Sequence, residues 1–111
     1  MEDRLLQQLK KGVLEMLVLE IICQAPTYGY ELMGKLKARS CEMFTLKEGT
    51  LYPILHSLEK DKLVTSREME TPGGRTRRYY HITALGLKAL EEKEAEWRVY
   101  SKAVTAILAG A

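Results

Sequence analysis

Apolar side chains recur at helical spacing through the first part of the chain, and they predict a helix over residues 4–24. The repeat consists of Leu5, Leu9, Val13, Met16 and Leu17. Such spacing places apolar side chains on one face of an α-helix. Residues 13–22 are apolar on nearly every side, so we expect this half of the helix to be buried. Ala25 and Pro26 then end the helix.

Two further helices are expected after this one. Thr27 is a preferred N-cap residue and predicts a second helix over residues 28–39. Thr45 and Glu48 have the spacing of a capping box, which predicts a third helix over residues 47–60. The core face of this third helix carries Leu51, Leu55 and Leu58, with Ile54 at its edge.

A hairpin and a long final helix complete the pattern. Residues 63–67 and 77–82 are rich in β-forming residues, and the Thr-Pro-Gly-Gly segment 71–74 between them has strong turn chemistry. Thr83 is then a suitable N-cap for a last helix over residues 84–108. This helix would be about 40 Å long, which is more than a small domain can cover.

A heptad seam runs along the last helix. Its members are Leu90, Trp97, Tyr100, Val104 and Ile107, and the first, second and fourth of them are seven residues apart. Lys93 interrupts the seam at the equivalent earlier position. The seam needs a partner, and a second copy of the chain is the simplest one. We therefore expect a homodimer in which residues 84–111 form the dimerisation helix and residues 1–83 the rest of one structural domain.

Composition and charge narrow the function. The chain has 111 residues, enough for one domain, and its net charge is +2. Residues 35–82 carry ten basic and six acidic side chains, which suits a basic face on that part of the fold. No apolar segment is long enough to cross a membrane, and no signal peptide is visible, so we expect a cytoplasmic protein. The two cysteines do not suggest a disulfide framework or a metal site, and no cofactor is expected.

Three helices followed by a hairpin, at this chain length, indicate a winged helix-turn-helix, a mainly α fold with a small β-hairpin. A helix fits the major groove of DNA and presents its side chains to base edges. Arginines beside a glycine turn can follow phosphates or enter the minor groove. The sequence therefore predicts a transcriptional regulator that binds double-stranded DNA at the two half-sites of a pseudo-palindromic operator.

Candidate DNA contacts come from the polar face of the third helix and from the hairpin. They are Lys47, Thr50, Tyr52, His56, Ser57 and Lys60 on the helix and Arg67, Arg75, Arg77 and Arg78 on the hairpin. Pro53 removes a backbone hydrogen bond on the non-core face of the helix, and such a cost suggests that this face has a task. Exposed helix faces and hairpin arginines are often only solvated. Their combination with the order of the elements and the dimer helix favours DNA binding.

Four motifs resemble the PadR transcriptional regulators, in particular their small subfamily without a separate C-terminal domain. The motifs are YGYEL at residues 28–32, EGTLYPIL at 48–55, LEKDKLV at 58–64, and GRTRRYYHIT at 74–83 running into Leu85-Gly86. The resemblance covers residues 9–108, and the motifs are highly specific only in combination.

The resemblance implies a homodimeric repressor whose first and last helices build the dimer interface. It also implies that the second and third helices and the hairpin contact DNA. Carried over by position, the contacts are Tyr28, Tyr30, Gly49, Thr50, Tyr52, Pro53 and the hairpin arginines. The family pattern usually has glycine where this chain has Lys62, so a left-handed turn there would be strained or the turn would differ.

Trp97 falls where drug-binding members of the subfamily place an aromatic side chain across the dimer axis. The resemblance thus implies a flat aromatic or drug-like effector that releases the repressor. The alternative is that Trp97 simply packs in the dimer seam.

Two other classes of function fit the sequence less well. An enzyme needs a nucleophile with a base, a metal cluster or a phosphate loop, and neither His56 nor His81 has an evident acid or cysteine partner. A winged-helix module that binds protein instead of DNA should carry large apolar residues on the exposed face of the third helix. Only Tyr52 and Pro53 qualify there.

Overall fold

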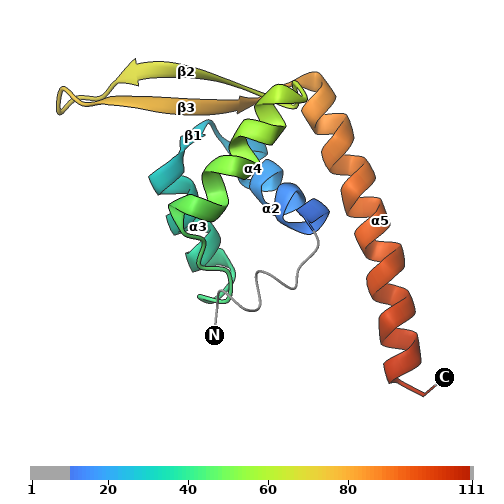
Figure 1. Ribbon diagram of the computed structural model, residues 1–111. Helices are drawn as coiled ribbons and strands as arrows, with labels where there is room; N and C mark the ends of the chain where they lie inside the picture. The colour runs from blue at the N-terminus through green and yellow to red at the C-terminus, as the bar shows by residue number, and fades with distance from the viewer. Residues whose placement is uncertain (1–10, 111) are drawn as a thin grey trace.

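The computed structural model describes residues 11–110, so residues 4–10 of the predicted first helix lie outside the described residues (Figure 1). The elements are α2 (Lys11–Gln24), β1 (Thr27–Tyr28), α3 (Gly29–Arg39), α4 (Glu48–Lys60), β2 (Val64–Glu70), β3 (Thr76–Ile82) and α5 (Ala84–Leu108). The mainly helical fold with a small sheet is as predicted, and α5 has the predicted bounds. We call residues 64–82, which form β2, β3 and their turn, the wing.

Helix α2 is the centre of the packing, and it contacts α3, α4, β3 and α5. Its apolar side chains meet those of α3, α4 and the base of the wing in one core. The most deeply buried members are Val18, Leu19, Ile22, Leu32, Leu51, Leu55, Leu58 and Val64. Burying one such side chain contributes about 1.5–3 kcal/mol, so this core supplies the stability that holds the exposed faces in place. Cys23 packs against the same core.

The sheet has three strands in the order β1-β3-β2, all antiparallel, because the short strand β1 adds to the predicted hairpin. Thr27 in β1 pairs with Tyr80 and is fully buried. The predicted N-cap role of Thr27 was therefore wrong. Tyr28 occupies the N-cap position, and the Thr27 hydroxyl donates to the Glu31 carboxylate at 2.7 Å instead. Strand pairing overrode the local preference of Thr27.

The predicted capping box at the start of α4 was also wrong. The helix begins at Glu48, and its N-cap is Lys47, which makes no side-chain capping hydrogen bond. Thr45 lies two residues before this N-cap, and its hydroxyl donates to the carbonyl of Glu42 at 3.3 Å. The helix starts where Leu46 and Leu51 enter the core, so packing sets its first residue.

A left-handed turn joins α4 to the wing. Lys62 has φ 63°, the conformation that glycine adopts most easily. The Lys62 amide donates to Glu59 at 3.0 Å and the Leu63 amide to Leu58 at 2.9 Å, which is the Schellman pattern of helix ends. The turn therefore keeps its shape with lysine in the glycine position, at a conformational cost of about 1–2 kcal/mol.

Helix α5 is fastened to the base of the wing at its first turn. The Thr83 hydroxyl accepts a hydrogen bond from the Gly86 amide at 2.9 Å, as expected for an N-cap. The same hydroxyl donates to the carbonyl of Lys62 at 2.8 Å. A methyl group at Gly86 would overlap the backbone carbonyl of Leu63. Only glycine lets α5 approach the turn after α4 this closely.

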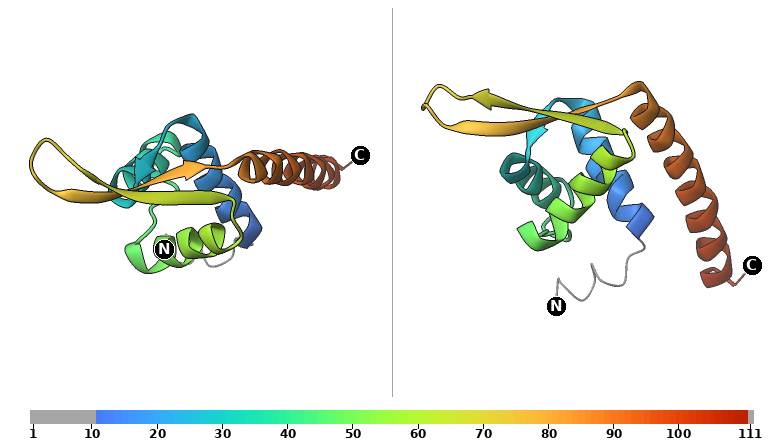
Figure 2. Two further views of the ribbon diagram at one scale, coloured as in Figure 1. Left: turned by 90° about the horizontal axis from the view of Figure 1, so that it is seen from above. Right: turned by 45° about the horizontal axis from the view of Figure 1, so that its top comes forward.

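After its first turns, which pack against α2, helix α5 diverges from the rest of the molecule (Figures 1 and 2). Leu90 is 6% exposed and belongs to the core of the protomer, so the exposed part of the predicted seam begins at Trp97. Lys93 turns toward α2 and forms a salt bridge with Glu15 at 3.3 Å. This pairing inside one protomer accounts for the lysine that interrupts the heptad pattern.

The close approach at Gly86 gives a stability prediction. Gly86→Ala should lower the free energy of unfolding by about 1–3 kcal/mol, because the added methyl group must displace backbone. Gly34→Ala is the matched control: it lies in α3 with no atom within 4 Å of the new methyl group. The control should raise stability by about 0.5–1 kcal/mol. Urea unfolding measures both, and similar values for the two variants would contradict the tight junction.

Candidate nucleic-acid interface

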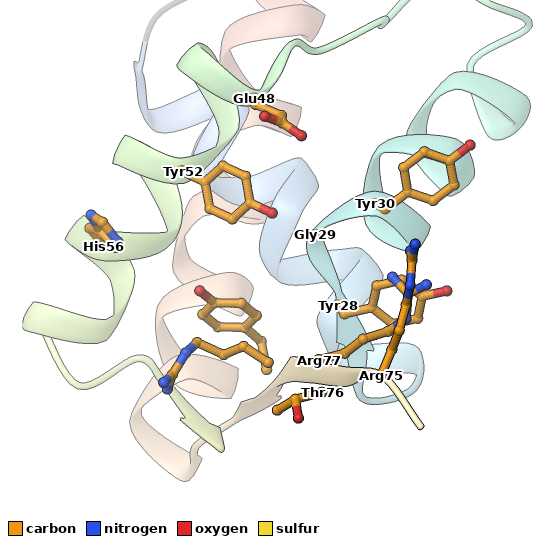
Figure 3. Close-up of a pocket in the computed structure, with 11 residues that line it drawn as sticks. Tyr28, Gly29, Tyr30, Glu48, Tyr52, His56, Arg75, Thr76 and Arg77 are labelled. Atoms are coloured by element: carbon orange, nitrogen blue, oxygen red, sulfur yellow. The ribbon is translucent and has the colours of Figure 1, made fainter. Parts of the chain in front are cut away.

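An open groove of about 600 Å³ lies between the exposed face of α4, the start of α3 and the strand β3 of the wing. Seven of the predicted site residues line it: Tyr28, Tyr30, Tyr52, His56, Arg75, Arg77 and Arg78. Figure 3 shows Tyr52 and His56 on α4 across the groove from Tyr28 and Arg77. Segments that are far apart in the sequence thus contribute aromatic and basic side chains to one concave surface.

The other predicted residues lie outside the groove, on α4, at its N-cap Lys47 and, for the exposed Arg67, on β2. Lys47, Gly49, Thr50, Pro53 and Lys60 are exposed, and Ser57 is half-buried. Pro53 lacks the N–H that would bond the carbonyl of Gly49, and both residues are exposed to water. The exposed face of α4 is therefore a polar surface that no other described element covers, which is the requirement for a helix that enters a major groove.

Sequence reasoning missed four residues that line the groove: Gly29, Glu48, Thr76 and Tyr80. Gly29 is there for a packing reason, because the Tyr52 ring and hydroxyl occupy the place of its missing side chain. Tyr52 therefore links α4 to the start of α3 and exposes 36% of its surface. Tyr80 could have been found from strand alternation, since it lies two residues before the apolar Ile82.

Tyr28 and Arg77 form an ordered cluster where the wing meets α3. The Arg77 guanidinium lies over the Tyr28 ring, 4.4 Å from its centre, and the Tyr79 ring meets the same ring edge-on at 5.3 Å. A cation over an aromatic face keeps its positive charge while its position is restrained. Arg77 can therefore present a fixed charge at the N-terminal end of α3, where the helix dipole also favours an anion.

The four wing arginines, Arg67, Arg75, Arg77 and Arg78, have different surroundings. Arg75 is exposed beside Gly74, whose φ is 80°, and it makes no salt bridge within residues 11–110. Arg78, in contrast, forms a salt bridge with Glu68 at 3.1 Å and donates to the Ser66 hydroxyl at 3.0 Å. Arg67, Arg75 and Arg77 form no salt bridge within the described residues, so the unpaired positive charge of the wing belongs mainly to these three.

Tyr80 forms part of the groove and is only 2% exposed. Burial raises the pKa of Tyr80 above its ordinary value, and the nearby Glu59 carboxylate and Tyr52 raise it further. The Arg78 guanidinium opposes this change by lowering the pKa of Tyr80. The phenol therefore stays neutral at physiological pH, and it adds no negative charge to a surface that must attract phosphates.

A sequence model described as the transcriptional regulator PadR-like family matches residues 18–92, a span that contains the groove, the wing and the first turns of α5. The chain belongs to the PadR-like family of transcriptional regulators. PadR-like proteins are DNA-binding regulators and not enzymes, which confirms the function class predicted from the sequence.

Relatives of known sequence or structure agree with this family. A PadR-like transcriptional regulator of Bacillus cereus is 41% identical, with a TM-score of 0.77 over 88% of this chain and 93% of that chain. An uncharacterised protein of Lysinibacillus sphaericus is 31% identical over 90% of this chain and 92% of its own length. The transcriptional regulator YqjI of Escherichia coli is 29% identical over 90% of this chain, which spans only 46% of YqjI.

Two further observations concern residues 11–110 of this PadR-like chain. No helix in this part is long and apolar enough to cross a membrane. No group of His, Cys, Asp and Glu side chains there could hold a metal ion.

Proposed function

We propose that this PadR-like protein is a homodimeric repressor that binds a pseudo-palindromic operator and is released by a flat aromatic ligand. The observation that carries the proposal is the groove beside the bare polar face of α4, which brings the recognition surface and the basic wing together. In this reading residues 1–83 form the DNA-binding part and residues 84–111 the dimerisation helix.

The two helices α4 of a dimer would enter successive major grooves on one side of the duplex. Their proposed contacts are Lys47, Gly49, Thr50, Tyr52, Pro53, His56, Ser57 and Lys60. Tyr28, Tyr30, Arg75 and Arg77 would meet the adjacent backbone, where basic side chains supply most of the affinity. Arg78, also predicted as a contact, is engaged within the protomer by Glu68 and Ser66. The exposed face of α4 offers only Tyr52 and Pro53 as large apolar groups, so its chemistry favours DNA over a protein partner.

Base reading by α4 can be tested at Thr50. Thr50→Ala should weaken binding to the selected operator by about 1–3 kcal/mol and leave binding to random DNA nearly unchanged. Thr50 is exposed, so the fold should tolerate the change. Thr105→Ala, an exposed threonine on α5, is the matched control and should bind both DNAs like wild type. Equal losses on operator and random DNA would show that Thr50 only positions the backbone.

The dimer proposal depends on the part of α5 that leaves the protomer. The face of α5 that buries Leu90 continues as Trp97, Val104 and Ile107, whose exposed fractions are 40%, 40% and 76%. Small proteins seldom leave such a continuous apolar stripe in water. A second α5 is the occupant that the heptad spacing fits, and an isologous pair of helices would cover both stripes.

Charge placed in this stripe should separate the protomers. Trp97→Asp with Val104→Asp would bury carboxylates in the interface, at a cost of several kcal/mol. Val99→Asp is the matched control, because Val99 is 72% exposed and lies on the opposite side of α5. Sedimentation at micromolar concentration should find dimers for the wild type and the control and monomers for the double variant. A monomeric wild type would refute the dimer.

The ligand proposal depends on two aromatic rings in the same stripe. Trp97 and Tyr100 are stacked, with ring centres 6.0 Å apart and planes at 29°, and both are exposed in the protomer. Across a dimer axis Trp97 would face its symmetry mate, and a flat aromatic compound could stack between the two. Offset stacking adds about 0.5–1.5 kcal/mol to the burial of the rings.

Ligand and DNA should then oppose each other. A compound wedged between two α5 helices would change the distance between the α4 helices. The compound should therefore weaken the binding of operator DNA, and DNA the binding of the compound, by about 1–3 kcal/mol. Planar phenols and dyes can be titrated against the fluorescence of Trp97 with and without operator DNA. Trp97→Ala is the control for ligand binding. Because this variant lacks the fluorophore, the effect of the compound on it is measured by DNA retention. Quenching that is indifferent to DNA, or no quenching, would leave Trp97 with a packing role only.

A further inference from the structure

We propose that Arg78 is a positioning residue for DNA recognition: it fastens the wing to α4 through Ser66 and Glu59, and it does not contact phosphate. The inference rests on the proposed DNA interface of α4 and the wing. It separates Arg78 from Arg75 and Arg77, with which it forms one basic run in the sequence.

Strand alternation places Arg78 on the inner face of the wing. Successive side chains of a strand point to opposite faces, and directly paired residues share a face. Arg78 is paired with Glu68 and stands two residues before Tyr80, whose partner is Ser66. Tyr80 is buried, as is Val64 two residues before Ser66. Arg78 therefore lies on the face that turns toward the core, whereas Arg77 lies on the other face.

A chain of hydrogen bonds links Arg78 to α4. Its guanidinium donates to the Ser66 hydroxyl at 3.0 Å, and that hydroxyl donates to the Glu59 carboxylate at 2.6 Å. A second guanidinium nitrogen bonds Glu68 at 3.1 Å. Glu59 belongs to the last turn of α4, Ser66 and Glu68 to β2, and Arg78 to β3. The planar fork of arginine can serve both acceptors at once, which an ammonium group cannot do with the same geometry.

The charges around Arg78 make it a poor phosphate contact. One guanidinium stands among two carboxylates, Glu59 and Glu68, so the cluster carries a net negative charge. By comparison, Arg77 lies over a neutral ring and Arg75 makes no salt bridge within the described part of the chain. Because counterion release depends on positive charge brought to the phosphates, Arg75 and Arg77 should contribute to it and Arg78 should not.

The position of this link explains why it matters for recognition. From Ser66 the wing extends by four more residues of β2, about 13 Å, before its turn begins. Figures 1 and 2 show this part projecting beyond α3 and α4. Because this part of the wing is long, a small rotation of the wing about its base would displace Arg75 by a much larger distance. The link between Glu59 and Arg78 fixes that rotation relative to the helix that reads the bases.

The test compares Arg78 with Arg75 on two duplexes, one that the wild-type protein selects from a random library and a shuffled one of the same composition. Arg75→Ala should lower the salt slope of binding by about 1 on both duplexes. Arg78→Ala should leave the salt slope unchanged and weaken binding to the selected duplex alone. The loss should be about fivefold, a modest effect because the link is partly exposed to water. Arg78→Lys keeps the charge but loses the fork, so it should behave like Arg78→Ala.

Ser66→Ala completes the test, because it removes the hydroxyl between Glu59 and Arg78 and leaves every charge in place. It should reproduce the selective loss, and the double variant with Arg78→Ala should lose no more than either single variant. If Arg78→Ala proves unfolded in a thermal melt, Arg78→Lys and Ser66→Ala decide the matter between them.

Three results would overturn the inference: a salt slope lowered by Arg78→Ala, full recovery in Arg78→Lys, or a Ser66→Ala protein that binds like wild type. A wild-type protein that selects no duplex from the random library would instead overturn the proposed function, and the positioning role with it.

Discussion

The contact between Gly86 and the carbonyl of Leu63 is the constraint on which the arrangement of the other elements depends. At this point the end of α4, both ends of the wing and the start of α5 meet within a few residues. Thr83 follows β3 directly, and its hydroxyl caps α5 and bonds the turn after α4, so it joins the wing to both helices. Because the close partner of Gly86 is a backbone carbonyl and not a flexible side chain, α5 has little freedom to tilt. The direction of α5 relative to the recognition surface is thereby set by close backbone packing and by the hydrogen bonds of Thr83.

The wing shows how one basic sequence can divide into two physical roles. On one face, Arg77 is held by Tyr28 and keeps its charge for an external partner. On the other face, Arg78 pairs with Glu68 and donates to the Ser66 hydroxyl within the protomer. A two-stranded ribbon has few long-range contacts of its own, so it needs such a tie at its base to hold an angle. Affinity and orientation can then be supplied by neighbouring residues without competing for the same side chain.

Much of this fold could be predicted from periodicity. The bounds of α5 and its cap at Thr83 follow from local rules, because few competing contacts act on that segment. The caps at Thr27 and Thr45 were predicted wrongly for different reasons. Strand pairing overrode the preference of Thr27, whereas Thr45 bonds a local carbonyl, that of Glu42, ahead of a helix that begins at Glu48. Strand β1 has only two residues, which is too short for any periodic signal.

The candidate site was predictable in composition but not in role. The residue types on α4 and the wing indicated DNA, whereas the partition between Arg77 and Arg78 required knowledge of which wing face is buried. Alternation from Val64 and Ile82 could have supplied that partition. The contact of Tyr52 with Gly29 could not be anticipated, because it joins two helices whose relative position depends on the whole core.

On the proposed dimer, the rigid junction has a consequence for regulation. Helix α5 has 25 residues and spans about 37 Å. Its first turns are held by the wing base and by α2, up to the pair of Lys93 and Glu15. From Trp97 onward no other described element supports it. A partner helix or a ligand that shifts α5 near Trp97 would therefore move the body of the protomer as one piece. Since DNA fixes the spacing of its half-sites and resists bending, even a small change of helix crossing angle would displace α4 from its groove. Tight packing at Gly86 is thus what would allow a change at the dimer interface to reach the DNA without any change inside the protomer.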